Sequence, residues 1–186
     1  MLNNIRFLVK NLVFRLRGDH TTEKLIKNGL QVGENFNRMV GVIIDPSHCH
    51  HITIGDNVTL APRVHILAHD ASLKTFIGYS RIGNVVIGNR VFIGADSVVL
   101  PGVMIGDDVI IGANSTITKS IPSGSVVVGS PARIICSTEE LIQKHRNLMS
   151  NRPIYNSSYS FRNNPSDEMK KQMRTDLSDM LPGYIE

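Results

Sequence analysis

Histidine supplies most of the chemistry that this 186-residue chain could perform. His69 stands in the stretch RVHILAHDASLK, where an apolar segment ends and a polar one begins. A second group, HCHH at 48 to 51, combines imidazoles with a thiol. An imidazole that titrates near neutral pH can act as a general base or bind a metal, so both chemistries are open to these residues.

The HCHH group is a weak candidate for a metal site. In an extended segment His48 and His50 share one face while Cys49 and His51 take the other, which does not assemble a tetrahedral set of ligands. We expect the group to line an acceptor site or to pack against the fold. Cys49 and Cys136 form no spacing motif, and we expect reduced thiols in a cytoplasmic protein.

The elements that position these residues are predicted from a repeat of six residues. An aliphatic residue stands at each of 87, 93, 99, 105, 111 and 117, and glycine follows it at four of these places. An earlier block, from Ile54 to Ile66, keeps the same period. Six is the period of neither a helix nor an ordinary strand. We therefore expect short extended pieces, separated by turns and stacked on their equivalents, rather than antiparallel strands with glycine turns.

Between the two blocks the repeat is interrupted. Ile66 and Ile87 are 21 residues apart, which is one coil of 18 plus three, and the residues from about 69 to 84 are mostly polar. We expect part of this stretch to leave the coil as a loop, with His69 at its lip. There the imidazole could serve as a base beside the coil wall or cap the coil end. Asp70 is a weaker candidate, because adjacent side chains rarely face each other.

Two stretches carry a family resemblance, IGDNVTLAP and VFIGADSVVLPGVMIGDDVIIGANSTITKSIPSGSVVVGSPAR. They resemble the hexapeptide-repeat acyltransferases, most of all the maltose and galactoside O-acetyltransferases and the related sugar acetyltransferases of capsule and lipopolysaccharide pathways. The resemblance covers roughly residues 30 to 136. It implies an all-β solenoid, a left-handed parallel β-helix with three hexapeptides per coil, assembled as a homotrimer with acetyl-CoA as acyl donor.

The resemblance also implies roles for individual residues. His69 matches the catalytic general base, and Asp45 falls near the acid that binds the acceptor sugar, although it could equally cap a turn. Five positions match the donor site, where cations are needed for the phosphates: Ala95, Ala113, Thr118, Lys119 and Arg133. Taken by itself, Lys119 could equally be a solvent-exposed lysine in a turn. A second arginine of the galactoside enzymes is replaced by Cys136.

The two ends differ from the repeats. Residues 1–29 are expected to form a basic amphipathic helix, to about Arg17, and a cap for the open end of the coil; peripheral membrane association is the alternative. Residues 137–186 form a C-terminal helical extension: Ser137 and Glu140 make a capping box for a helix to about Met149. A second helix should run from Pro165 to about Met180.

Composition excludes several functions. The net charge of +4 is matched by Arg6, Lys10, Arg15 and Arg17, which leaves 16 basic residues against 16 acidic ones, so bulk charge does not favour nucleic acid. No apolar run reaches the 18 or so residues of a membrane span. The N-terminus lacks the small-residue cleavage site of a signal peptide.

The sequence therefore predicts an acetyl-CoA-dependent O-acetyltransferase acting on a sugar or polysaccharide precursor. The thioester is already reactive, so a base is sufficient and no covalent nucleophile or metal is required. Three alternatives stay open: a sugar N-acetyltransferase, a metalloenzyme like the γ-class carbonic anhydrases, and a non-catalytic scaffold. The chain lacks the H-x4-H pair that those carbonic anhydrases carry.

Overall fold

The computed structural model describes residues 20–186, so the predicted helix up to Arg17 lies outside the described residues. The chain divides into two compact units, one ending at Thr138 and the other running from Glu139 to Glu186. Each is described by itself. The described helices include none that is both long and apolar enough to cross a membrane.

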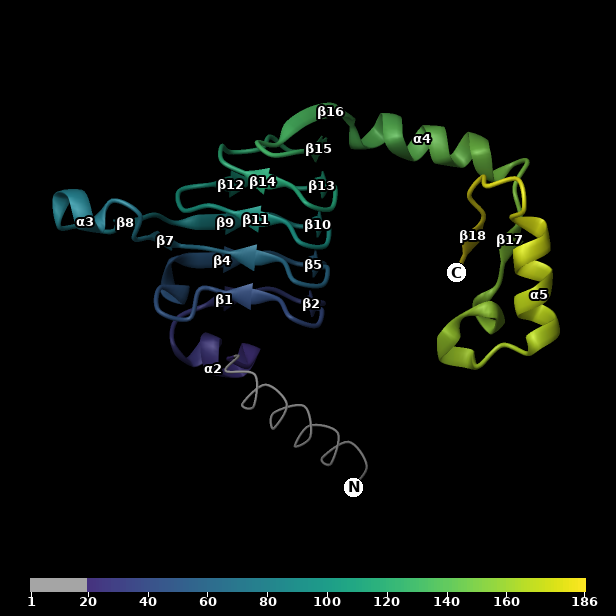
Figure 1. Cartoon of the computed structure of the whole chain (residues 1–186), viewed down its shortest axis with the longest axis horizontal. Coiled ribbons are helices and arrows are strands. Elements are labelled where there is room, and N and C mark those ends of the chain that lie inside the picture. The colour runs from purple at the N-terminus through teal and green to yellow at the C-terminus, as the bar shows by residue number, and fades with distance from the viewer. Residues whose placement is uncertain (1–19) are drawn as a thin grey trace, which may run out of the picture. The chain divides into compact units, whose positions relative to one another are not determined.

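The first unit consists of three sheets of very short strands, stacked as three columns (Figure 1). The first sheet holds β1 (Gln31–Val32), β4 (Ile52–Ile54), β9 (Val85–Ile87) and β12 (Met104–Ile105). The second holds β2 (Asn37–Arg38), β5 (Thr59–Leu60), β10 (Phe92–Ile93), β13 (Ile110–Ile111), β15 (Ser125–Val128) and β16 (Arg133–Ser137). The third holds β3 (Ile43–Ile44), β6 (His65–Ile66), β11 (Val98–Val99) and β14 (Thr116–Ile117).

Consecutive strands visit the three sheets in rotation, and their neighbours pair in parallel. In the regular part of the stack Val98 pairs with Thr116, and the N–H of Ser115 donates to the hydroxyl of Ser97, 18 residues earlier. One turn of the chain therefore takes three six-residue pieces. The end of the stack departs from this pattern: β15 follows β14 but lies in the second sheet rather than the first, and β16 turns back antiparallel to β15. The six-residue period thus specifies parallel stacking, and the antiparallel alternative is wrong.

The aliphatic residues of the repeat form the interior of this unit. The repeat positions are buried without exception: Ile54, Leu60, Ile66, Ile87, Ile93, Val99, Ile105, Ile111 and Ile117. Five valines four places further on are also buried: Val58, Val64, Val91, Val103 and Val109. Several corners use residues with positive φ, such as Asn57 and Asn114 (both 57°), which tolerate the left-handed region. Burial of these two rows provides the hydrophobic stabilisation of the stack.

The regular turn is broken twice. Between the first and second coils Ile44 pairs with Ile66, and stacked residues such as Glu34 and Asp56 are 22 positions apart, four more than in a regular turn. Between the second and third coils stacked residues such as Arg63 and Asp96 are 33 positions apart, almost a whole coil more than in a regular turn. The expected excess of three is wrong, because Ile66 and Ile87 lie in adjacent sheets, one side of a coil apart.

Both insertions have structure of their own. The shorter contains the 3₁₀ turn η1 (Cys49–His51). The longer leaves the stack as expected, and consists of β7 (His69–Asp70) paired antiparallel to β8 (Arg81–Ile82), with α3 (Lys74–Ile77) between them (Figure 1). Ahead of the stack, α2 (Thr22–Lys27) buries Leu25 in the core.

The second unit is built around two helices and a short pair of parallel strands. Its elements are α4 (Thr138–Met149), β17 (Ile154–Tyr155), η2 (Ser157–Tyr159), η3 (Phe161–Asn163), α5 (Asp167–Asp176) and β18 (Tyr184–Ile185). The helix to Met149 is confirmed. The second helix starts at Asp167 behind the N-cap Ser166 and ends at Asp176, earlier than expected, because Asp179 leaves the helix to bind Arg152.

Candidate active site

The two insertions leave the stack at the same corner, where the chain passes from the third sheet to the first. Asp45 follows β3 directly, and its N–H donates to the carbonyl of Ile66 in the next coil (2.9 Å). The loop that begins after β6 therefore starts next to Asp45. At the far side, Nδ1 of His51 lies 2.8 Å from Oδ1 of Asn84, so the two insertions are also joined at their ends.

Asp45 is a buried carboxylate with no exposed side-chain surface. Its Oδ1 accepts from the backbone N–H groups of Ser47 (3.1 Å) and His48 (3.2 Å) and from the Ser47 hydroxyl (2.9 Å). Its Oδ2 accepts from the N–H of Ala68 (3.1 Å) and from His69. Burial raises the pKa of Asp45, but the hydrogen bonds from His69, Ser47 and Ala68 outweigh it and hold the pKa below its ordinary value. The carboxylate is therefore ionised at neutral pH.

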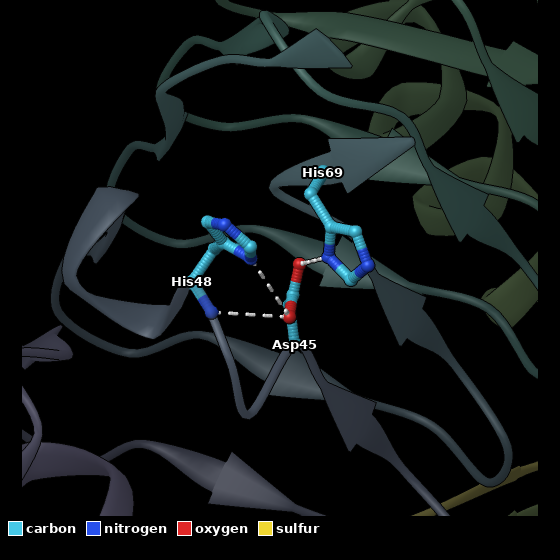
Figure 2. A group of neighbouring side chains, drawn as sticks. All are labelled: Asp45, His48 and His69. Carbon is cyan, nitrogen blue, oxygen red and sulfur yellow. Dashed lines mark hydrogen bonds and ion pairs between the residues drawn. The ribbon is translucent and has the colours of Figure 1, made fainter. Parts of the chain in front are cut away.

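His69 presents its other ring nitrogen away from that carboxylate (Figure 2). An ionised carboxylate can only accept, so the shared proton lies on Nδ1 and the lone pair on Nε2. The side chain is 35% exposed, so substrate can reach it. The strand that carries His69 is held by an ion pair between Asp70 and Arg81 (3.3 Å) at the root of the loop. The predicted base thus has the tautomer and the access that general base catalysis requires.

The geometry offers a second role for Asp45, besides the predicted binding of substrate: the carboxylate could orient His69. Five donors of the chain converge on its two oxygens. A group so enclosed is suited to orienting His69, and contact with an acceptor would require it to open. The geometry favours the orienting role.

His48 is the residue that sequence reasoning did not single out. The expectation of an extended HCHH segment is wrong, since η1 turns it and Cys49 is buried with its thiol 3.5 Å from the carbonyls of Leu25 and Asn28. His48 instead lies beside His69, with the ring centroids 4.6 Å apart. The sequence does carry a sign of this insertion: Ile44 and Ile54 are ten residues apart, where the repeat would place them six apart.

Asp45, His48 and His69 offer ligand atoms that all lie within 4.8 Å of one another, which is close enough for a metal ion. Both carboxylate oxygens already accept hydrogen bonds, however. A metal would have to displace the bond from Nδ1 of His69. The arrangement as it stands is that of a carboxylate-imidazole pair.

The predicted donor residues lie at two corners of the stack and on β16. Ala95 and Ala113 occupy the corner between the second and third sheets, one coil apart, with the N–H of Asn114 donating to the carbonyl of Ala95 (2.8 Å). Thr118 and Lys119 follow β14 and are exposed at the corner of His69, two coils further on. Arg133 is exposed at the start of β16. One copy of the chain thus leaves them divided by the width of the third sheet.

The sequence from 84 to 119 matches the family model described as "Bacterial transferase hexapeptide (six repeats)". Protein CapG of Staphylococcus aureus is 41% identical over 138 residues, which cover 70% of this chain and 80% of that protein. A galactoside acetyltransferase solved in complex with coenzyme A is 30% identical, covers 76% of this chain and 84% of its own, and superposes with a TM-score of 0.54. The chain belongs to the bacterial hexapeptide-repeat transferases.

The Bacillus subtilis protein called putative acetyltransferase YvoF is 35% identical over 115 residues, covering 62% of this chain. The chain spans 64% of the length of that relative.

Proposed function

We propose that the chain is an acetyl-CoA-dependent O-acetyltransferase acting on a hydroxyl of a sugar or a polysaccharide precursor. The observation that carries the proposal is His69, hydrogen-bonded at Nδ1 to a buried carboxylate and open at Nε2. The names of the relatives support acetyl transfer, and the coenzyme A complex of the galactoside acetyltransferase supports the donor. The three parallel sheets are expected to form a left-handed β-helix, as the family implies.

The reaction needs one proton to move out and back. Nε2 of His69 takes the proton of the acceptor hydroxyl while its oxygen attacks the thioester carbonyl, and Asp45 stabilises the imidazolium that results. When the tetrahedral intermediate collapses, the C–S bond breaks and the imidazolium returns the proton to the CoA sulfur. Oxygen is acetylated, thiol is released, and the base is restored without a net change in charge.

The donor site would be completed by a second copy of the chain. Lys119 and Arg133 are proposed to bind the CoA phosphates, Thr118 to contact the outer end of the pantetheine arm, and Ala95 and Ala113 to leave room for it. Their separation in one chain supports a site shared between copies, and the family implies a homotrimer with three such sites. The proposal includes a cytoplasmic location. Peripheral membrane association through the N-terminal segment is the alternative.

The test is acetyl-CoA-dependent thiol release across a panel of sugars and nucleotide sugars. His69→Ala should lower kcat roughly 10²–10⁴-fold while calorimetric binding of CoA survives. His65→Ala is the matched control, since His65 lies on the outer face of β6 and is not among the hydrogen-bond donors to Asp45. A folded His69→Ala protein that keeps more than about a tenth of the wild-type kcat would refute the base assignment.

Three further measurements separate the alternatives. An ester product is cleaved by mild base and an amide is not, which distinguishes O- from N-acetylation. Stoichiometric metal in the purified protein would favour the metalloenzyme. No change in melting temperature with CoA would favour the scaffold.

A further inference from the structure

A second imidazole, that of His48, lies across the Asp45 carboxylate from the base (Figure 2). Its backbone N–H donates to Oδ1 of Asp45 (3.2 Å), and its Nδ1 lies 4.0 Å from the same oxygen. His69 uses the other oxygen, Oδ2. One buried carboxylate therefore binds the imidazole of His69 through one oxygen and the backbone of His48 through the other, with the His48 ring nearby.

The two rings are also in contact with each other. Their centroids are 4.6 Å apart and their planes are inclined by 33°, which is within the range of packed aromatic pairs. His48 is held in turn by the Ser47 hydroxyl, 3.3 Å from its Nδ1, and its side chain is only 31% exposed. The hydrogen bond at Nδ1 fixes one edge of the His69 ring but leaves the ring free to tilt about that bond. The His48 ring blocks this tilt from one face.

We propose that His48 is a positioning residue for the base, on the premise of the acetyl transfer proposed above. Its ring keeps Nε2 of His69 aimed at the acceptor hydroxyl, and it need not touch the reacting atoms itself. A misplacement of about 1 Å can lower turnover by about 100-fold. Loss of the His48 ring should therefore appear in kcat and leave the KM for acetyl-CoA alone.

Among the described residues, four titratable side chains face the His48 ring. Asp45 faces it from the residue after β3, His69 from β7, and His50 and His51 from its own segment, with centroids at 6.1 and 6.4 Å. His48→Phe keeps a flat ring of similar size and removes the titrating group. His48→Ala removes the ring. His50→Ala removes a neighbouring exposed imidazole that is not among the hydrogen-bond donors to Asp45 and serves as the control.

Steady-state kinetics are the first measurement. His48→Ala should lower kcat about 10- to 100-fold with the KM for acetyl-CoA within about twofold of wild type. His48→Phe should recover kcat to within about threefold, and His50→Ala should match the wild type. Should His48→Ala not fold, His48→Leu takes its place as the side chain without a ring. A folded His48→Phe protein as impaired as His48→Ala would overturn the packing role.

Proton NMR supplies a second measurement that does not depend on turnover. The Nδ1–H of His69, deshielded by its hydrogen bond to Asp45, should give a downfield signal that His69→Ala abolishes. In His48→Ala this signal should exchange faster with water, and in His48→Phe it should be restored. An unchanged signal and an unchanged kcat in His48→Ala would contradict the inference, as would absence of the signal from the wild type. If no acceptor is acetylated, the proposed function fails, yet the NMR result still decides whether His48 holds the ring.

Discussion

A buried carboxylate destabilises a protein unless hydrogen bonds replace the water that it has lost. Asp45 meets this condition with five donors, three of which are backbone N–H groups supplied by the two insertions. The same contacts that allow the charge to be buried also bring His69 and His48 together. At the scale of the residue, the insertions and the carboxylate depend on each other.

Replacement of Asp45 by Asn should therefore affect stability as well as catalysis. The amide would turn an NH₂ group toward donors, and we expect a loss of about 2–4 kcal/mol in the free energy of unfolding at pH 7. Because the pKa of Asp45 is lowered in the folded protein, its contribution is fully present above the unfolded pKa of about 3.9. It should be lost as the pH falls through the folded pKa.

Denaturant unfolding of both proteins between pH 3 and 7 measures this effect. The difference between wild type and Asp45→Asn should narrow below about pH 4. Glu34→Gln, on an exposed turn, is the control and should show no such dependence. A difference that stays constant across the range would mean that Asp45 is not ionised in the folded protein.

The sequence allowed His69 and Asp45 to be named but not their contact. Which residue of one coil lies over which residue of the next depends on the lengths of the insertions, and these shift the stacking from 18 positions to 22 and to 33. The repeat does not show which of the three sheets each residue belongs to. The length of the longer insertion was therefore underestimated. The position of His48 could not be predicted either, because it depends on the turn at Cys49–His51 within the shorter insertion.

At the scale of the element, adjacent residues of the two-residue strands face opposite sides of the wall. In β10 Ile93 is fully buried while Phe92 is 45% exposed. The six-residue period predicts this, because the buried aliphatic position recurs in every six-residue piece. The repeats were therefore predictable in detail. The second unit, which has no repeat, was predictable only in its helices.

Aspartate at these two adjacent positions should have opposite outcomes. Ile93→Asp places a charge in the interior without a partner, which is severely destabilising, and we expect insoluble protein. Phe92→Asp should remain soluble with a cooperative melt, because the side chain lies on the outer face. Soluble expression and thermal melts by circular dichroism distinguish the two. A well-folded Ile93→Asp protein would mean that the interior has been assigned to the wrong face.

At the scale of the whole molecule, the donor residues pose a geometric problem. Ala95 and Ala113 lie at one corner of the stack, and Thr118 and Lys119 at another, with the third sheet between them. A single pantetheine arm cannot use both corners of one chain at once if the sheet lies between. The arrangement makes sense if one copy offers the first corner while its neighbour offers the second. This assembly could not be derived from the repeat, which specifies only the coil.

A shared site predicts that two crippled variants can repair each other. The double variant Ala95→Leu, Ala113→Leu should raise the KM for acetyl-CoA, because the larger side chains would fill the space proposed for the pantetheine arm. His69→Ala should lose the base. If one copy supplies His69 and its neighbour supplies the corner of Ala95 and Ala113, unfolding and refolding the two variants together should restore intact sites, about a quarter of the total for random mixing at equal amounts.

The assay is thiol release at an acetyl-CoA concentration well below the KM of the double variant, where each variant alone is nearly inactive. Mixing the variants without refolding is the control, because intact oligomers should not exchange copies on the timescale of the assay. Recovery of activity only after joint refolding would establish that the site is built from two chains. A refolded mixture no more active than the sum of its parts, yet with the same oligomeric state by light scattering, would place His69, Ala95 and Ala113 of each site on one chain.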